Sequence, residues 1–165
     1  MLLDIPPRQT MMHYPTEVGQ LNQTATSTEP LELVLDDERP TSPSPRDLPD
    51  ALDRACIAAK IAAENKGENV VVLDLTAITP IFDYFVIATG NSRRLVHTIV
   101  EEIDTALTRL GDERMSVTGY ETSKWVVQDY GDVMCHVFDP ETRSYYNLED
   151  LWADAERIDW EAELD

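Results

Sequence analysis

Basic residues are scarce in this chain of 165 residues. Lys and Arg number 13 against 32 Asp and Glu, which gives a formal net charge of −19. Binding to DNA or RNA requires Lys and Arg to displace the counterions of the phosphates, and anionic membranes attract basic segments. The charge therefore argues against direct DNA binding and membrane-surface binding, and it favours a basic protein partner.

Cysteines and long apolar runs are also scarce. Cys56 and Cys135 cannot build a disulfide framework or a four-thiolate zinc site, and both lie in apolar runs. We expect buried thiols in a reducing compartment. No apolar run approaches the ~20 residues that span a bilayer. The first residues lack the basic-then-apolar order of a secretory signal and are too acidic for a transit peptide. These absences predict a cytoplasmic protein.

The composition divides the chain into three parts. Residues 1–47 hold eight acids and three bases, and eight of the ten prolines fall at or before Pro49. We expect a disordered, acidic, proline-rich extension there, because this part cannot bury enough apolar area to offset chain entropy. Residues 48–152, with a net charge of −9, are predicted to form one domain. Residues 153–165, with six acids and one base, are expected to form an acidic tail or a frayed helix.

Apolar periodicity predicts the elements of the domain. The apolar spacing and the Pro and Gly positions predict helices at 50–66, 91–110 and 139–152, with a short helical turn near 80–83. β-Branched runs predict two strands buried on both faces, and shorter alternating runs predict three more. The strands are expected at 69–75, which reads as central, and at 84–89, 115–118, 125–129 and 133–138. This order predicts an α/β fold with a small mixed sheet of about five strands flanked by helices.

The last two predicted strands form a hairpin, because Tyr-Gly-Asp at 130–132 is a tight-turn sequence. Side chains alternate between the two faces of a strand. Trp125 and Asp129 should therefore face one side, and Gln128 and Tyr130 the other.

Residues suited to catalysis are few. Of the three histidines, only His136 lies in a predicted strand, where a packed, hydrogen-bonded imidazole is the favoured reading. The stretch 89–94 opens a helix after a strand, as phosphate sites do, but a single glycine is a weak signal that helix capping explains. We find no Gly-x-Ser-x-Gly elbow and no His-Glu-x-x-His pair. The residues therefore predict no catalytic residue, no cofactor and no small-molecule substrate.

Four acids cluster around the hairpin and the start of the last predicted helix: Asp129, Asp132, Asp139 and Glu141. Carboxylates of this kind can hold magnesium. Turn and cap roles explain each of them locally, and we favour that reading, with no metal site.

Aromatic residues crowd the last third of the chain and are interleaved with charges. Aromatics beside charged groups are typical of an interface hot spot, and core packing is the alternative for each of them. In a continuous helix, Tyr145, Leu148 and Trp152 would share one face. Five of these aromatic residues are interleaved with charged residues: Trp125, Tyr130, Tyr145, Tyr146 and Trp152.

Three ordered blocks carry a resemblance to a known family. They are residues 83–93 (DYFVIATGNSR), 125–138 (WVVQDYGDVMCHVF) and 141–152 (ETRSYYNLEDLW). Together they resemble the ribosomal silencing factor family, also called Iojap-like, over about residues 50–152. One position departs from the family pattern: Thr118, before Gly119, stands where the family usually has Glu.

The resemblance implies a non-enzymatic translation factor whose fold is nucleotidyltransferase-like without the active site. Such a factor binds the large ribosomal subunit through its fourteenth protein and blocks joining with the small subunit, chiefly when nutrients are scarce. The resemblance also implies a secondary role in large-subunit biogenesis and a homodimer when the protein is free. Two other hypotheses are a metal-dependent nucleotidyltransferase that uses the hairpin acids, and a generic acidic adaptor or dimerisation module.

We expect the partner to contact the hairpin and the last helix. Trp125, Asp129, Tyr130 and Asp132 should lie together on the hairpin, and acids and aromatics of the helix should extend the patch. The full expected set is Trp125, Asp129, Tyr130, Gly131, Asp132, His136, Glu141, Arg143, Tyr146, Glu149 and Trp152.

Overall fold

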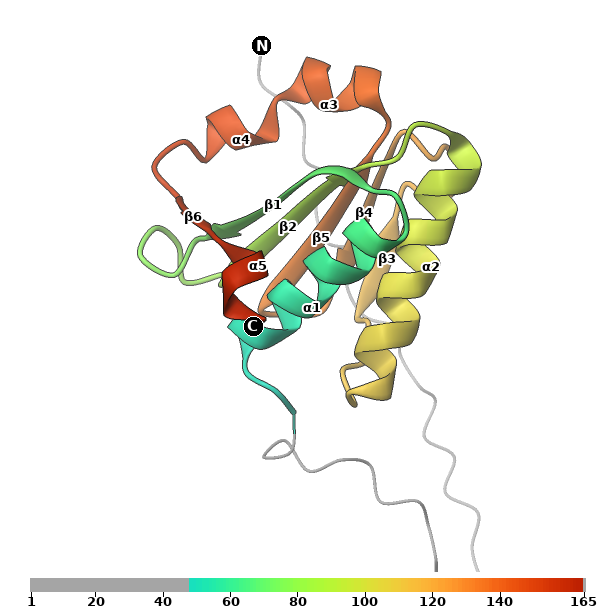
Figure 1. Cartoon of the computed structure of the whole chain (residues 1–165). Helices are drawn as coiled ribbons and strands as arrows, with labels where there is room; N and C mark the ends of the chain where they lie inside the picture. The colour runs from blue at the N-terminus through green and yellow to red at the C-terminus, as the bar shows by residue number, and fades with distance from the viewer. Residues whose placement is uncertain (1–47, 165) are drawn as a thin grey trace, which may run out of the picture. The chain divides into compact units, whose positions relative to one another are not determined.

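A computed structural model describes residues 48–164 of the chain. The predicted extension at 1–47 lies outside the described residues. The described part is an α/β fold, as predicted, with a mixed sheet of six strands in the order β3-β4-β5-β2-β1-β6 (Figure 1). The strands are β1 (Glu68–Asp74), β2 (Tyr84–Thr89), β3 (Ser116–Thr118), β4 (Trp125–Asp129), β5 (Val133–Phe138) and β6 (Glu156–Ile158).

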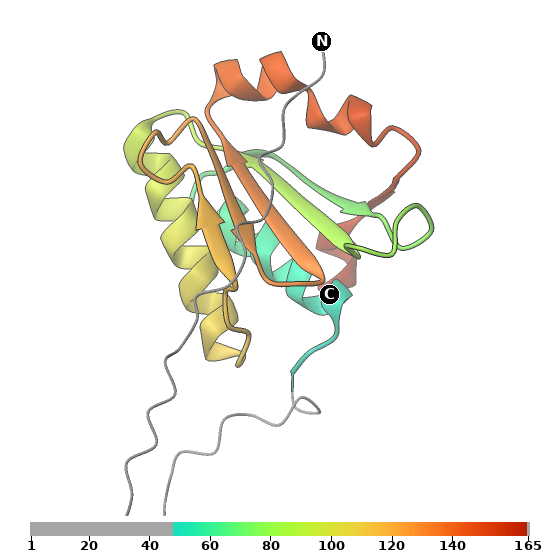
Figure 2. The same cartoon turned by 180° about the vertical axis from the view of Figure 1, so that it is seen from behind.

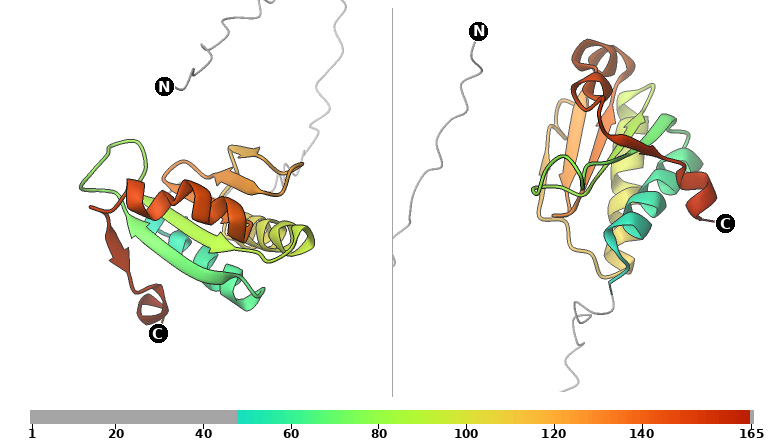
Figure 3. Two further views of the ribbon diagram at one scale, coloured as in Figure 1. Left: turned by 90° about the horizontal axis from the view of Figure 1, so that it is seen from above. Right: turned by 90° about the vertical axis from the view of Figure 1, so that its left-hand side faces the viewer.

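Two long helices cover one face of the sheet. α1 (Ala51–Glu64) is capped by Asp50, and α2 (Arg93–Arg109) is capped by Ser92, whose side chain accepts from the Leu95 N–H at 3.1 Å. Figure 3 shows both helices on the same side of the sheet. Their apolar stripes bury the side chains of alternate strand residues, among them Val86, Val126 and Cys135. Both cysteines are buried, as predicted, and burial raises the pKa of Cys56 to about 11.

The other face of the sheet is covered only near one end. α3 (Pro140–Tyr146) and α4 (Leu148–Leu151) lie there, and among the described residues no helix crosses the middle of this face (Figure 2). Its core consists of the alternate strand residues Phe85, Ile87 and Phe138, together with Leu148 of α4. The two cores follow from the period of two along each strand.

The strand pairings place the β4–β5 hairpin beside the centre of the sheet. β5 runs parallel to β2, with Ile87 opposite His136, and antiparallel to β4, with Trp125 opposite Phe138. All other pairs are antiparallel. Within the described residues, no helix is both long enough and apolar enough to span a membrane.

The prediction of one continuous helix at 139–152 is wrong. The chain breaks between α3 and α4 at Asn147, which has a φ of 44°. Asn tolerates this left-handed conformation better than most residues because its short side chain bonds locally, here to Asp150. The break turns α4 out of the line of α3, so residues before and after Asn147 no longer share a helical face.

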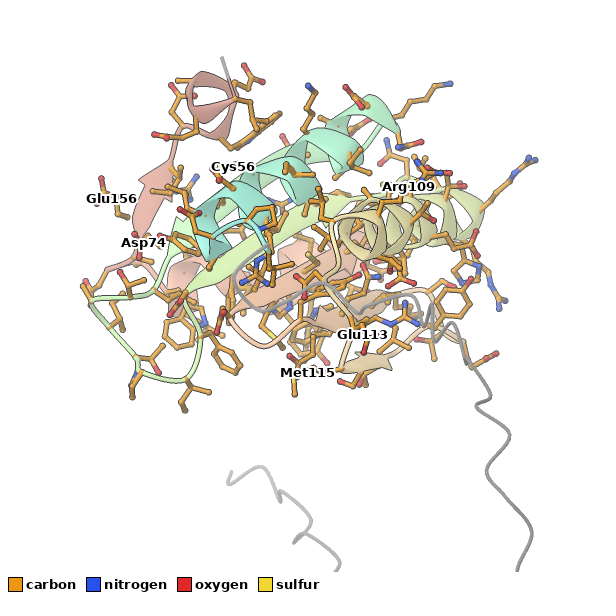
Figure 4. All side chains as sticks on the ribbon, turned by 90° about the horizontal axis from the view of Figure 1, so that it is seen from below. Cys56, Asp74, Arg109, Glu113, Met115 and Glu156 are labelled. Carbon is orange, nitrogen blue, oxygen red and sulfur yellow. The ribbon has the colours of Figure 1, made fainter. Side chains whose placement is uncertain are left out.

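The expected acidic tail is also wrong, because residues 156–158 form β6 and residues 160–163 form α5 (Trp160–Glu163). β6 pairs with β1, so β1 is next to the edge of the sheet and not central. The pairing sets Asp74 directly opposite Glu156, as Figure 4 shows. Like charges at opposed positions destabilise a pair of strands, so this pair opposes the pairing of β6 with β1. The expected helical turn near 80–83 is absent as well.

Candidate partner-binding surface

Trp125 occupies the start of β4 on the incompletely covered face of the sheet, where other rings surround it. Its ring stacks on that of its cross-strand partner Phe138, with centroids 4.8 Å apart, and packs against Tyr146 of α3 at 4.9 Å. Tyr146 in turn meets Tyr145 edge-on at 5.1 Å. Aromatic pairs at these separations stabilise one another beyond their burial of area. Trp125 is therefore a half-buried and closely packed ring.

A shallow depression of about 390 Å³ opens beside Trp125. Tyr145, with 81 % of its surface exposed, and Tyr146, with 49 %, form one side of it. Large exposed aromatics grouped with polar neighbours are typical of protein interfaces. We call this group the aromatic surface: Thr122, Lys124, Trp125, Glu141, Thr142, Tyr145 and Tyr146.

His136 lies beneath Trp125 and is only 5 % exposed, so it is not available for contact with a partner. The indole Nε1–H of Trp125 donates to His136 Nδ1 at 3.2 Å. Indole nitrogen is a donor only, so this bond places the proton of the neutral imidazole on Nε2. Burial lowers the pKa of His136 to about 4, which keeps the ring neutral near pH 7.

The protonated Nε2 of His136 has no hydrogen-bond partner among the described residues. Leaving a buried polar group unsatisfied costs about 1–3 kcal/mol. The ring lies close to Phe85, with centroids 4.6 Å apart, so its surroundings are largely aromatic. An apolar ring at this position would avoid the penalty, and what the imidazole contributes instead is an acceptor for Trp125.

Tyr130 does not belong to the aromatic surface, contrary to our prediction. It is 4 % exposed and faces α2 on the opposite side of the sheet. Its hydroxyl donates to Asp104 Oδ1 at 3.0 Å and accepts from Gln128 Nε2 at 3.1 Å. Burial raises the pKa of the Tyr130 hydroxyl.

The turn of the hairpin is also separate from Trp125. Asp129 and Trp125 occupy opposite ends of β4, about 13 Å apart at the usual rise per residue. Asp129 accepts from the backbone N–H of Gly131 at 2.8 Å, which is a turn role. Exposed Asp132 pairs with the buried Arg54 of α1 at 3.0 Å, and Arg54 also pairs with Asp112 at 2.6 Å. The turn therefore ties the hairpin to α1 and is not brought together with the aromatic surface.

Arg143 and Glu149 pair with each other instead of facing solvent. Arg143 Nε donates to Glu149 Oε1 at 3.0 Å, and Arg143 Nη1 donates to Thr89 Oγ1 at 2.8 Å. Their side chains are only 12 % and 13 % exposed. This pair, which we call the α3–α4 clamp, spans the break at Asn147 and anchors both short helices to the end of β2.

Of the remaining predicted residues, Glu141 is exposed on the first turn of α3 and lines the depression. Trp152 is half-buried and meets Phe85 edge-on at 5.6 Å, so it is mainly a core residue. Tyr145 is an exposed residue that the expected set omits, because a continuous helix would align it with Leu148. Thr118 is exposed on the edge strand β3, away from the depression.

The hairpin acids show local backbone and ion-pair roles. Asp139 caps α3 by accepting from the Thr142 N–H at 2.7 Å, while Asp129 and Asp132 have the partners given above. Over residues 48–164, no group of three or more His, Cys, Asp or Glu side chains is arranged to hold a metal ion. Ser92 caps α2 at the stretch considered for phosphate. Local roles thus account for Asp129, Asp132 and Asp139, the acids on which the hypothesis of a metal-dependent nucleotidyltransferase rests.

Comparison with known proteins shows the family and supports the fold. A family model described as "Ribosomal silencing factor during starvation" matches residues 48–165, a range that extends beyond the resemblance at residues 50–152 to include the C-terminal segment. The ribosomal silencing factor RsfS of Halalkalibacterium halodurans is 40 % identical over 105 residues, which cover 64 % of this chain and 90 % of the relative. The crystal structure of protein CV0518 from Chromobacterium violaceum is similar, with a TM-score of 0.62 and 30 % identity, covering 64 % of this chain and 88 % of that one.

A more distant relative comes from Mus musculus. It is named mitochondrial assembly of ribosomal large subunit protein 1 and is 28 % identical over 127 residues, which cover 75 % of this chain and 55 % of the relative.

Proposed function

This chain belongs to the ribosomal silencing factor family, and from that membership we propose that it silences translation by binding the large ribosomal subunit in the cytoplasm. In this proposal it docks on the fourteenth protein of that subunit and sterically prevents joining with the small subunit, chiefly when nutrients are scarce. A secondary role in large-subunit biogenesis is part of the same proposal. The name of the mouse relative, which refers to assembly of the ribosomal large subunit, supports the choice of subunit.

The aromatic surface is the part of the chain that we propose to contact the ribosomal protein. It combines a closely packed tryptophan with two exposed tyrosines, and such residues supply most of the binding energy in protein interfaces. The rest of the proposal is electrostatic. A protein of net charge −19 is repelled by ribosomal RNA and attracted by a basic protein, so the contact should fall on protein more than on RNA.

Co-sedimentation with purified large subunits tests the proposal. We expect the full chain to pellet with large subunits at low salt and, at saturation, to reduce the formation of joined ribosomes in sucrose gradients. Trp125→Ala should weaken binding at least tenfold, because loss of a hot-spot aromatic usually costs 2 kcal/mol or more. A matched control is Trp160→Phe, which lies in α5 outside the aromatic surface. Absence of co-sedimentation, or unimpaired joining at saturation, would contradict the proposal.

The oligomeric state of the free protein belongs to the same proposal. We expect a homodimer in solution that gives way to a monomer on the subunit, and analytical ultracentrifugation of the full chain measures it.

A further inference from the structure

His136 and Trp125 form a hydrogen-bonded pair in which one ring is accessible to a partner and the other is buried. Trp125 lines the depression of the aromatic surface, whereas His136 is buried below it and is not among the residues that line the depression. The bond from Trp125 Nε1 to His136 Nδ1, at 3.2 Å, is the polar contact between the two rings. It joins a side chain that a partner can reach to one that a partner cannot reach.

We propose that His136 is a positioning residue for partner binding, which fixes the indole of Trp125 in its binding orientation through the Nδ1 acceptor. This inference rests on the proposed function, because it assigns a role within the same surface. It also changes the role that we expected for His136, from direct contact with the partner to action through Trp125.

The packing explains why Trp125 needs such a bond. Phe138 supports the indole through stacking, and Tyr146 lies at a tilt of 46° against it. Stacked and tilted rings resist displacement, but a turn of the indole by about 180° about its Cβ–Cγ bond keeps a ring face on Phe138 and exchanges the two edges of the ring. A hydrogen bond at Nε1 selects one of these two orientations. It therefore selects which edge of the indole points toward the depression.

The unpartnered Nε2 of His136 strengthens the inference. A phenylalanine would fill a similar volume among Phe85, Phe138 and Trp125 without burying an unsatisfied N–H. The imidazole is thus unfavourable for packing at this position and favourable only for the bond to Trp125. Preorganising an anchor before binding increases affinity, since less conformational freedom is lost in the complex.

The test compares three variants of the full chain in binding to purified large subunits. His136→Phe removes the acceptor and retains a ring, and we expect its Kd to rise about 3- to 10-fold, the range that corresponds to one net hydrogen bond. His136→Asn places an amide oxygen where Nδ1 lies, so it should recover part of that loss. Trp125→Ala, which removes the anchor itself, should lose more than either.

A spectroscopic readout separates positioning from simple stability. With 5-fluorotryptophan incorporated, the ¹⁹F resonance assigned to Trp125 should shift or broaden in His136→Phe and return toward its original position in His136→Asn, while the other two tryptophan resonances stay unchanged. If His136→Phe fails to fold, benzothienylalanine at position 125 provides the same test, because sulfur replaces the indole N–H without changing the ring shape.

The outcomes distinguish the inference from the proposed function. If Trp125→Ala binds as well as the original chain, the aromatic surface is not the binding site, and both the proposed site and the inference are overturned. If Trp125→Ala loses affinity while folded His136→Phe, or the benzothienylalanine variant, binds within twofold of the original, only the positioning role is overturned.

Discussion

The hydroxyl of Tyr130 links three elements at the scale of a single residue. It bonds Asp104 of α2 and Gln128 of β4, and Gln128 Nε2 also donates to the carbonyl of Val100 at 3.0 Å. Asp104 further pairs with Arg114 at 3.1 Å. This network holds the hairpin against α2 on the face of the sheet opposite to Trp125, so its role is structural.

Tyr130→Phe should lower stability without changing binding. Loss of the hydroxyl removes two hydrogen bonds and leaves the ring packing intact, so we expect the free energy of unfolding to fall by about 1–2 kcal/mol. The affinity for large subunits should stay within twofold. Urea unfolding and co-sedimentation measure the two quantities, and Tyr145→Phe, on the exposed tyrosine, is the control with no expected loss of stability. A loss of affinity in folded Tyr130→Phe would contradict this assignment.

The buried imidazole of His136 predicts a pH dependence. In the unfolded chain it takes up a proton near pH 6.5, whereas burial lowers its pKa in the folded state to about 4. Between these values the unfolded state binds more protons, so stability is fully present above about pH 6.5 and is lost as pH falls toward 4. The expected loss over this range is up to about 3 kcal/mol.

The measurement is urea unfolding between pH 7 and 4.5 for the original chain and for His136→Phe. Because carboxylates also titrate in this range, the difference between the two curves isolates His136. We expect the original chain to lose more stability on acidification than the variant, and parallel curves would contradict the prediction.

At the scale of elements, the break at Asn147 determines which side chains of α3 and α4 line the depression and which enter the core. Tyr145 and Tyr146 end α3 pointing toward the depression, while Leu148 of α4 enters the core. The α3–α4 clamp holds the two pieces in this arrangement, because Arg143 reaches both Glu149 and Thr89 of β2. The orientation of the aromatic surface therefore depends on the largely buried ion pair of Arg143 and Glu149.

Glu149→Gln should lower both the stability of the fold and the affinity of the aromatic surface for large subunits. Removing the charge leaves the largely buried guanidinium of Arg143 with a neutral amide oxygen in place of a carboxylate, so we expect a loss of about 1–3 kcal/mol in the free energy of unfolding. The affinity for large subunits should fall two- to fivefold, because α3 is held less firmly. Asp154→Asn, a loss of one exposed acid, is the matched control for charge. Unchanged stability in Glu149→Gln would show that the clamp contributes nothing measurable.

Prediction from the sequence succeeded at this scale where local patterns are decisive. The bounds of β2, β4 and β5 match the predicted strands, and α2 begins after a capping Ser92 as its sequence predicts. The alternation of side chains along the strands also predicts that Tyr130 and Trp125 lie on opposite faces of the sheet. The assignment of both residues to one binding site disregarded this prediction. The break at Asn147 and the strand β6 lack a comparable local signal.

At the scale of the whole molecule, the acidic charge is concentrated more strongly in the folded part than the sequence suggested. Residues 156–158 form β6 of the sheet and residues 160–163 form α5, and residues 48–165 together carry 24 acids and 10 bases, a net charge of −14. Steering toward a basic partner should depend mainly on this part.

Two whole-molecule measurements follow. Deleting residues 1–47 removes a net charge of only −5, so the Kd for large subunits should change by less than about threefold. Raising ionic strength from about 50 to 200 mM should slow association about tenfold, in the full and the shortened chain alike, because screening weakens long-range attraction. Stopped-flow kinetics measures the rates. A tenfold loss of affinity on deletion would show that residues 1–47 belong to the binding site.

Local sequence patterns were enough to predict the fold class, most element bounds, the two faces of the hairpin and the burial of both cysteines. These features follow from periodicity, capping and turn residues that act over a few positions. The roles of single side chains, in contrast, follow from contacts that form when the chain folds. Arg143 and Glu149 read as surface groups until the bond of Arg143 to Thr89 is known, and residues 156–158 become a strand only because the edge of β1 offers unpaired backbone groups. Such contacts join residues far apart in the chain, and no local pattern records them.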